Sequence, residues 1–220
     1  MKFCLLDADY REDKIRLFGV DEKGKSVLVI TSFDNYFYVL DKNNSKEMEK
    51  NDLVKKIIKV KRTLGIKEEN FLKVFTPEPK TVREKMRNKS ESFEYSINLQ
   101  RKYLIDNEFY PLDWLTVKET ERKGQGVSRI IETSSVKKLK LIKNPKLKIL
   151  AFDIETIKGK VVMFSVADNK NYKKVFSSKN EKKLLQDFVK IIQKRDPDVL
   201  LSYNGDLFDL EVLRKRAEHH

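Results

Sequence analysis

The chain has 220 residues, of which 40% are hydrophobic and 37% charged, so it can form one large domain or two ordinary ones with real cores. A single cysteine, Cys4, excludes an internal disulfide. No apolar run reaches the roughly 18 residues that a membrane span needs, and acids come too early for a secretory signal. We therefore expect a cytoplasmic, intracellular protein with no membrane partner.

Positive charge is concentrated in one segment. Lys and Arg number 47 against 34 acids, a net charge of +13. Between Val117 and Lys148 ten cations stand against three acids, an excess of seven. Phosphates neutralised by such cations release counterions, which favours a polyanionic partner. A lysine-rich composition without any partner is the alternative, although clustering of the charge favours the polyanion.

The first 116 residues predict an α+β domain. Short apolar or alternating runs predict strands at 2–9, 14–20, 26–33 and 36–41. Residues 46–65 predict a helix, because Leu53, Ile57 and Ile58 recur at helical spacing and Gly65 stands where a helix stop is expected. A strand at 70–78 and a short helix after Pro79 come next.

Residues 117–146 read as a basic connecting segment, with an exposed turn at 118–129. The second domain is expected over 147–217. Its predicted order is strand (148–155), strand (161–167), strand (172–177), helix (180–195), strand (199–203) and helix (207–217). Pro197 lies just beyond the first of these helices, as is typical of a helix end.

Residues 19–26, "GVDEKGKS", match the written pattern of a phosphate-binding loop. Such a loop needs a helix directly after it, whereas "SVLVITSF" is dense in β-branched residues. Asp21 and Glu22 would also face the phosphates. We expect a hairpin turn with Gly24 at positive φ; a nucleotidase that depends on Lys25 is the remaining alternative.

Two acids share one face of the strand in "ILAFDIET". In an extended chain Asp153 and Glu155 project to the same side, about 7 Å apart along the strand. Small Ala151 beside them leaves room for one or two divalent cations, which would relieve the repulsion between the carboxylates. The alternative is a strand end that simply reaches solvent.

A third acid lies in "VLLSYNGDLFDL", residues 199–210. Here a strand breaks at Asn204 and Gly205 and restarts as a helix with Asp209 in its first turn. One interpretation is that Asp206 caps the helix and Asp209 complements its dipole. Acids at a strand end beside an acid at a helix start are also typical of a two-metal phosphodiester site.

"FDIET" and "YNGDLFD" resemble the first two exonuclease motifs of the archaeal type of family B DNA polymerases. "LDADY", "TVREKMR" (81–87) and "EYSINLQRKYLID" (94–106) resemble the N-terminal domain of these enzymes, so the likeness covers nearly the whole chain. It implies an α/β fold class. The N-terminal α+β domain would have hairpins and a ferredoxin-like portion, and the second domain a ribonuclease-H-like mixed sheet with flanking helices.

The resemblance also implies roles. Asp153, Glu155 and Asp209 would be the catalytic and metal-binding acids, with two Mg²⁺ or Mn²⁺ ions in the complete site. Tyr203, Asn204 and Phe208 would contact the 3′ end of DNA. The implied enzyme is an archaeal, intracellular DNA-directed DNA polymerase with a 3′–5′ exonuclease. Its partners would be primer–template DNA, the palm, fingers and thumb of the polymerase, and a sliding clamp.

The chain departs from the family pattern beyond the second motif. The third exonuclease motif and the polymerase domains have no counterpart in these 220 residues, so we expect an N-terminal fragment that is inactive by itself. Residues 218–220 read as the remnant of an affinity tag, with a native end as the alternative. A non-catalytic nucleic-acid-binding subunit of a split polymerase is the second interpretation.

Relatives of this type read template uracil in a pocket of the N-terminal domain, and Tyr10, Tyr36 and Arg83 agree with that pattern. Four positions differ from it. Asn35 and Asn98 replace prolines, Pro79 replaces a valine, and Lys102 replaces an arginine. Amide side chains would widen or wet a rigid apolar slot, so we expect weak or absent uracil discrimination.

Overall fold

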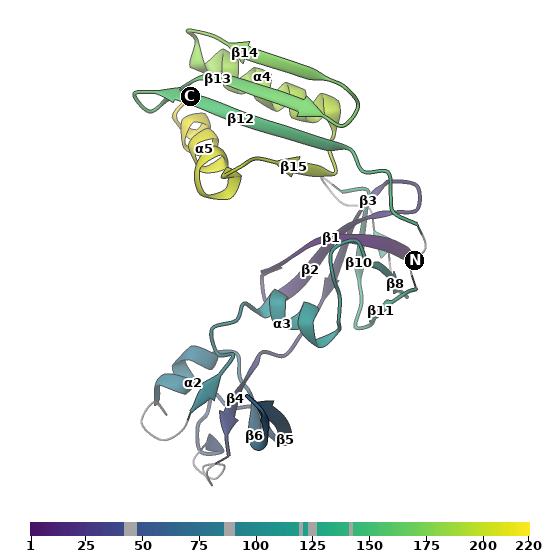
Figure 1. The fold of residues 1–220 in the computed structure, drawn as a ribbon, viewed down its shortest axis with the longest axis vertical. Coiled ribbons are helices and arrows are strands. Elements are labelled where there is room, and N and C mark those ends of the chain that lie inside the picture. The colour runs from purple at the N-terminus through teal and green to yellow at the C-terminus, as the bar shows by residue number, and fades with distance from the viewer. Residues whose placement is uncertain (42–47, 86–90, 119–120, 123–126, 141–142) are drawn as a thin grey trace. The chain divides into compact units, whose positions relative to one another are not determined.

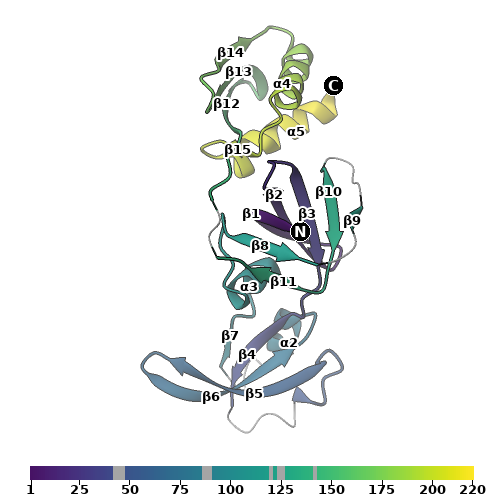
Figure 2. The ribbon, with the colours of Figure 1, turned by 90° about the vertical axis from the view of Figure 1, so that its right-hand side faces the viewer.

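The computed structural model describes residues 1–41, 48–85, 91–118, 121–122, 127–140 and 143–220. The chain divides into two compact units, Met1–Lys143 and Asn144–His220, and each is described by itself. Strands predominate in the first unit, and the second unit combines a sheet with helices, so the α/β class is confirmed (Figures 1 and 2). Within the described parts of the chain, no helix has the length and apolar character of a membrane span.

The first unit is built on a seven-stranded sheet in the order β11-β8-β1-β2-β3-β10-β9. Its strands β1 (Lys2–Arg11), β2 (Lys14–Asp21) and β3 (Ser26–Thr31) form an antiparallel meander, as predicted. β8 (Trp114–Val117) pairs with β1, and helix α3 (Leu99–Asp106) contributes Leu99 and Tyr103 to the core under the sheet. The predicted strands of this half therefore form one continuous core.

The segment 117–146 is not only a connection. It contains β9 (Glu121–Arg122), β10 (Arg129–Glu132) and β11 (Val136–Lys138), which complete the seven-stranded sheet. β10 lies parallel to β3, and its Ile131 is fully buried. The high charge of the segment hides the apolar residues of β10 from a reading of composition. Because Ile131 of β10 is buried in the core of the first unit, this part of the chain belongs to that unit.

The turn at residues 21–25 is a hairpin, as predicted. Asp21 accepts hydrogen bonds at Oδ1 from the backbone N–H groups of Lys23 (2.8 Å) and Lys25 (2.9 Å). Gly24 adopts φ +73°, which favours glycine. The next element is strand β3 and not a helix, so the phosphate-loop pattern has no helix N-terminus to work with.

A second sheet of the first unit has the order β5-β6-β4-β7 and is antiparallel throughout. Its strands are β4 (Tyr36–Leu40), β5 (Lys56–Leu64), β6 (Lys67–Phe75) and β7 (Ser92–Phe93). Helix α2 (Pro79–Lys85) contributes Val82 to the core on one face, with Phe37, Val39, Leu72 and Val74. This strand order, with α2 between β6 and β7, matches the expected ferredoxin-like portion.

The predicted helix at 46–65 is wrong over residues 56–64, while residues 46–47 lie outside the described part of the chain. Residues 56–64 form β5, which pairs with β6 along its whole length, and Gly65 at φ +64° makes the turn between them. β-Branched Ile57, Ile58 and Val60 suit a strand, and pairing with a neighbouring strand outweighs a weak helical spacing.

The second unit is a four-stranded mixed sheet in the order β14-β13-β12-β15. The strands are β12 (Ile149–Ile157), β13 (Lys160–Asp168), β14 (Lys173–Ser177) and β15 (Val199–Leu201). β15 is parallel to β12, and the other pairs are antiparallel. The strand and helix order confirms the prediction for this half.

Helix α4 (Glu181–Arg195) begins at Asn180, whose side chain accepts from the Lys183 N–H, and ends at Asp196 in the left-handed conformation. Between β15 and α5 (Leu210–His219) lies a π-helical turn, η1 (Gly205–Asp209). The core under the sheet combines side chains of β12, β13, α4 and α5: Leu150, Phe152, Ile154, Val161, Phe164, Leu184, Phe188 and Leu213.

Glu181 joins three elements of the second unit. Its carboxylate accepts hydrogen bonds from the Val161 N–H (2.8 Å) and from the guanidinium of Arg216 (2.8 and 2.5 Å). His220 Nε2 lies 2.9 Å from the same carboxylate, within the stretch 218–220 that reads as a tag remnant. The Arg216 side chain is the main reason that the pKa of Glu181 falls from 4.5 to about 2.

This ion pair predicts acid sensitivity of the second unit. Because the pKa of Glu181 is lowered on folding, its contribution to stability is complete above pH 4.5 and is lost as the pH falls towards about 2. Glu181→Gln should lower Tm at neutral pH and flatten the dependence of Tm on pH in that window. Thermal melts from pH 7 to pH 2 measure this.

Glu211→Gln is the matched control, because it also removes a carboxylate that pairs with an arginine. This pair, Glu211 with Arg214, lies on the exposed side of α5. Equal changes in Tm for the two variants would contradict the role given to Glu181.

Candidate functional site

The two acids of β12 lie on the face that the strand turns away from the core. Leu150, Phe152 and Ile154 are buried in the core of the second unit, whereas Asp153 and Glu155 are exposed. This is the alternation expected of a strand with one buried face. Within the described chain, neither carboxylate has a hydrogen-bond or ion-pair partner, so both are available to an external cation.

The neighbours of the two acids on the sheet are uncharged. On β13, Ser165 stands opposite Asp153 and Met163 opposite Glu155. The register of the pairing shifts between Glu155 and Thr156, immediately after the second acid. Such a bulge bends a strand and re-aims the side chains beside it. The two carboxylates therefore repel one another, and the adjoining strand supplies no cation to offset this.

Asp209 lies in a different environment. It is the last residue of η1 and only 3% exposed. Ser202, just after β15, donates a hydrogen bond from Oγ to Asp209 Oδ2 at 2.7 Å. A buried carboxylate is costly unless it is hydrogen-bonded, so Ser202 stabilises Asp209 in this position. No sequence pattern indicated Ser202, which stands seven residues before Asp209 and reaches it only because the chain reverses between them.

Gly205 makes this reversal possible. A Cβ atom built on Gly205 would lie 3.0 Å from the Cβ of Ser202, closer than side chains ordinarily approach. The π-helical turn that begins here is closed by the Leu210 N–H, which donates to the Gly205 carbonyl. Single π turns are frequent at functional sites. Any larger residue at 205 would push Ser202 away from Asp209.

The three acids do not form one cluster in this structure. Over the described ranges, no group of three or more His, Cys, Asp or Glu side chains is close enough to hold a metal ion. Asp153 and Glu155 provide the oxygen ligands that hard divalent cations prefer. Asp209 is instead bound to Ser202. The carboxylates of Asp153 and Glu155 on β12 are therefore suitable ligands for a cation, whereas the Asp209 carboxylate does not form a cluster with them.

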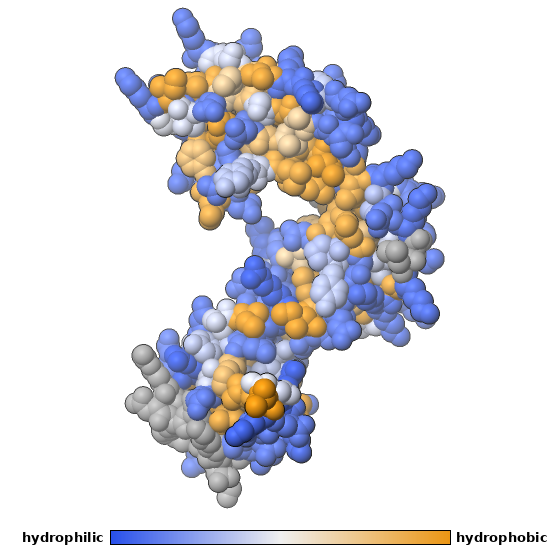
Figure 3. Space-filling view, in the orientation of Figure 1, coloured by the Kyte–Doolittle hydropathy of each residue, from blue (hydrophilic) through white to orange (hydrophobic). Residues whose placement is uncertain are grey.

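The three predicted DNA contacts lie beside Asp209. Tyr203 and Asn204 are exposed and line a pocket of about 320 Å³ together with Phe152, Leu201 and Leu207. Phe208 is 45% exposed. Figure 3 shows hydrophobic residues at the surface around β15. Exposed aromatic rings can stack on bases, which is the contact expected for a nucleic acid that lacks a second strand.

The residues of the predicted template-base pocket each have a separate local partner. The Tyr10 hydroxyl donates to Asp13 at 2.8 Å, and the Arg83 guanidinium lies 4.6 Å from the ring centroid of Tyr95. Tyr36 is 1% exposed, and its hydroxyl donates to Asp106 at 2.6 Å. None of these contacts joins one of the three residues to another.

Lys102 occupies the interior beside Tyr36. It is 1% exposed, and its ammonium donates to the Tyr36 carbonyl and to Asn35 Oδ1 (3.3 Å). Burial lowers the pKa of Lys102 to about 8. The lysine that replaces the family's arginine therefore serves as an internal bridge between α3 and the start of β4.

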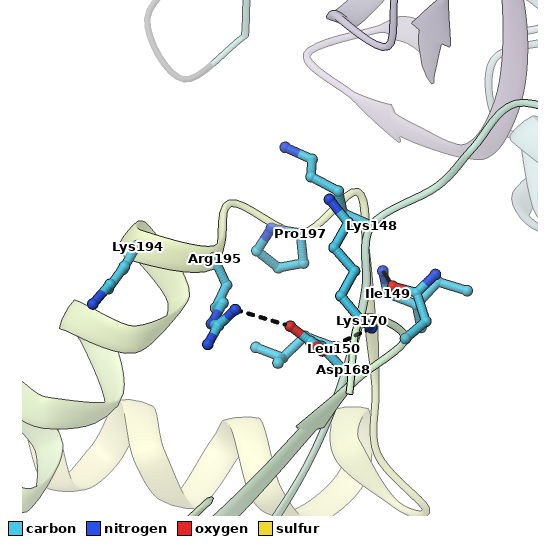
Figure 4. A pocket seen from close by; sticks show the side chains of 9 residues that line it. Lys148, Ile149, Leu150, Asp168, Lys170, Lys194, Arg195 and Pro197 are labelled. Atoms are coloured by element: carbon cyan, nitrogen blue, oxygen red, sulfur yellow. Dashed lines mark hydrogen bonds and ion pairs between the residues drawn. The ribbon is translucent and has the colours of Figure 1, made fainter. Parts of the chain in front are cut away.

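Part of the basic segment is neutralised internally. Lys138 pairs with Asp113 at 2.7 Å, and Lys148 pairs with Asp196 at 2.5 Å. Figure 4 shows a second pocket of the second unit, about 220 Å³, where Arg195 pairs with Asp168 at 3.2 Å. The cations that line it (Lys148, Lys170, Lys194 and Arg195) stand at the end of α4, where they offset the helix dipole.

Comparison with known proteins agrees with the motifs. The family model described as DNA polymerase family B, exonuclease domain, matches residues 90–172 and 163–220. The DNA polymerase of Archaeoglobus fulgidus is 32% identical over 241 residues, which cover 97% of this chain and 30% of that protein. The DNA polymerase of Pyrococcus glycovorans is 30% identical over 256 residues, with coverages of 97% and 29%.

Among solved structures, the family B DNA polymerase of the hyperthermophilic archaeon Pyrobaculum calidifontis matches with a TM-score of 0.82 and 27% identity. The match covers 99% of this chain and 32% of that one. The chain thus spans about a third of the length of these three relatives. With more than half of its residues matched by the family model, this chain belongs to the family B DNA polymerases.

Proposed function

We propose that this chain is the N-terminal part of a DNA-directed DNA polymerase, and that its second unit carries part of a metal-dependent 3′–5′ exonuclease site. The observation that supports it most is the pair of exposed, unpartnered carboxylates of Asp153 and Glu155 on one face of β12. The family of the chain and the names of its relatives agree with this function.

Each residue has a chemical role in the proposal. Asp153 and Glu155 bind a divalent cation, Mg²⁺ or Mn²⁺, through their carboxylate oxygens. Bound cations in such a site activate water and stabilise the leaving oxygen. Tyr203 and Phe208 stack on the bases at the 3′ end, and Asn204 offers its amide to the same strand. Together these residues position a single-stranded end beside the acids.

Asp209 is the third acid of the proposed site, and two cations are expected once the site is complete. Its carboxylate has to exchange the hydrogen bond from Ser202 for the shared cation. We propose that the buried bond to Ser202 keeps Asp209 ordered until then. The 220 residues contain no counterpart of the third motif, so weak activity is expected from this chain by itself.

The proposed partners are primer–template DNA with a single-stranded 3′ end, the palm, fingers and thumb of the polymerase, and a sliding clamp. The proposed location is the cytoplasm. A second candidate function, a non-catalytic nucleic-acid-binding subunit of a split polymerase, is favoured by one observation. The described residues contain no three-acid cluster ready for metal.

Metal binding tests the role of the acids directly. The double variant Asp153→Asn, Glu155→Gln should bind Mn²⁺ at least about tenfold more weakly than the unmodified chain, since even outer-shell partners of a metal are worth that much. Electron paramagnetic resonance of free Mn²⁺ measures the affinity without any need for activity. Asp187→Asn, on helix α4, removes an acid outside the site and should leave the affinity unchanged; a loss as large as that of the double variant would argue against the site.

Nuclease activity separates the two candidate functions. We expect at most weak Mg²⁺-dependent shortening of a 5′-labelled single strand by this chain, because the set of metal-binding acids is incomplete. Gel analysis of the products measures it, with Asp153→Ala as the control for contaminating nucleases. Efficient 3′–5′ degradation that disappears in Asp153→Ala would contradict the expected weakness and exclude the non-catalytic alternative.

Uracil discrimination is expected to be weak or absent. Lys102 and Asn35 are hydrogen-bonded to one another beside Tyr36, in the place where the family pattern implies an apolar slot. Competition binding with single strands that differ only in uracil against thymine measures the preference. A preference for uracil of about tenfold, or 1.4 kcal/mol, would overturn the prediction.

A further inference from the structure

The ferredoxin-like sheet of the first unit has two unlike faces. One is covered by α2, which packs Val82 against it. The other carries aromatic side chains of the two central strands, β4 and β6, and of β7: Tyr36, Tyr38, Phe71, Phe75 and Phe93. Figure 2 shows the four strands of this sheet. Helix α3 covers one end of this side, where the Lys102 ammonium lies 4.8 Å from the ring centroid of Tyr36 and Asp106 accepts a hydrogen bond from the Tyr36 hydroxyl. We call this surface the aromatic face.

The rings of the aromatic face form one continuous network. Tyr38 meets Tyr36 edge to face with centroids 5.3 Å apart, and Phe71 lies 6.4 Å away on its other side. Phe71 in turn meets Phe93 at 5.6 Å. Phe75 and Phe93 are partly exposed, while Tyr38 and Phe71 are 4% and 3% exposed. Something therefore covers the central rings.

The cover consists largely of cationic side chains from the same sheet. The Arg62 guanidinium lies 4.7 Å from the centroid of Tyr38 and donates to the Tyr38 hydroxyl. The Lys73 ammonium lies 3.7 Å from the centroid of Tyr36. Lys56 lies 6.0 Å from the centroid of Phe75. Cations over ring faces are attractive contacts. Arg62 and Lys56 are exposed, whereas the Lys73 ammonium also pairs with Asp106 at 3.5 Å.

The charge around this face suits a polyanion. The β5–β6 hairpin, residues 56–75, contains six Lys or Arg against two acids. The acids near the face are Asp106, 3.5 Å from the Lys73 ammonium, and Glu69, opposite Arg62 across the hairpin. A third acid, Glu94, interacts electrostatically with Arg62. Lys59 and Lys61 point to the other side of β5, and Lys61 pairs with Glu68 at 3.2 Å. Cations therefore outnumber acids on and around the face.

We propose that the aromatic face binds single-stranded nucleic acid. A four-stranded sheet whose central strands carry aromatic rings is a stacking surface for bases. Here the exposed Arg62 guanidinium lies over the Tyr38 ring and is hydrogen-bonded to its hydroxyl, and an arginine plane can stack on a base as a ring does. The exposed Lys56 is available to a phosphate of the same strand. This site belongs to the first unit and is independent of the exonuclease acids.

Two neighbouring cations on β5 provide a matched test. Arg62→Ala and Lys61→Ala each remove one positive charge from adjacent residues, but only Arg62 lies on the aromatic face. We expect Arg62→Ala to weaken binding of a dye-labelled 12-nucleotide single strand about fivefold or more, as loss of a stacked base does. Lys61→Ala should change the affinity less than about twofold. Fluorescence anisotropy of the full chain measures both.

Three further measurements make the outcome decisive. DNA and RNA strands of the same sequence identify which polynucleotide is preferred, and a duplex competitor should displace the strand poorly. Equal losses for the two variants, or no measurable binding of either strand, would overturn the proposal. The double variant Asp153→Asn, Glu155→Gln should retain the difference between Arg62→Ala and Lys61→Ala, so the exonuclease site and the aromatic face can fail separately.

Discussion

The period of two along β12 is the constraint on which the second unit depends. Leu150, Phe152 and Ile154 belong to the core with α4 and α5, so the residues between them must face the other way. A shift of one residue in register would bury Asp153 and Glu155 and expose the core side chains. Pairing with β13 on one side and with β15 on the other prevents this shift. The same burial that stabilises the sheet thus delivers two carboxylates to an open surface.

Asp209 is a buried acid whose position depends on one hydrogen bond. A charged side chain that is 3% exposed needs a donor, and Ser202 supplies it from a strand end seven residues away. The arrangement has a close approach of Gly205 to Ser202, where a Cβ on residue 205 would lie 3.0 Å from the Ser202 Cβ, and a π turn from Gly205 to Asp209. In the proposed site, fold stability and cation binding would therefore compete for one carboxylate. The bond to Ser202 stabilises the isolated unit, and a shared cation would have to replace it.

Periodicity in the sequence was a reliable guide where one element had one buried face. Alternation of apolar residues predicts the strands of the second unit, residues typical of helix ends predict α4, and glycine predicts the 21–25 turn. The structure agrees with all three. Periodicity failed at 46–65, where Leu53, Ile57 and Ile58 fit a helix by spacing, and pairing with β6 decided otherwise. Strand β10 was not predicted, because Ile131 stands among charged residues. Both errors concern segments whose structure is determined by pairing with another strand, which the spacing of apolar residues within one segment does not record.

The candidate site was predictable in its residue types and less so in its contacts. Alternation indicates that Asp153 and Glu155 share a face, but Ser202 and its hydrogen bond depend on a chain reversal that spacing alone does not reveal. The cationic residues show the same difference between residue type, which the sequence gives, and contacts, which it does not. Lys138 and Lys148 look like surface cations in the sequence, yet each has an acid partner within its unit. Arg62 and Lys73, in a segment whose spacing predicts a solvated helix and then a strand, lie on aromatic rings. Net charge therefore indicates that a polyanion is attracted, and the local geometry of each cation decides where it can bind.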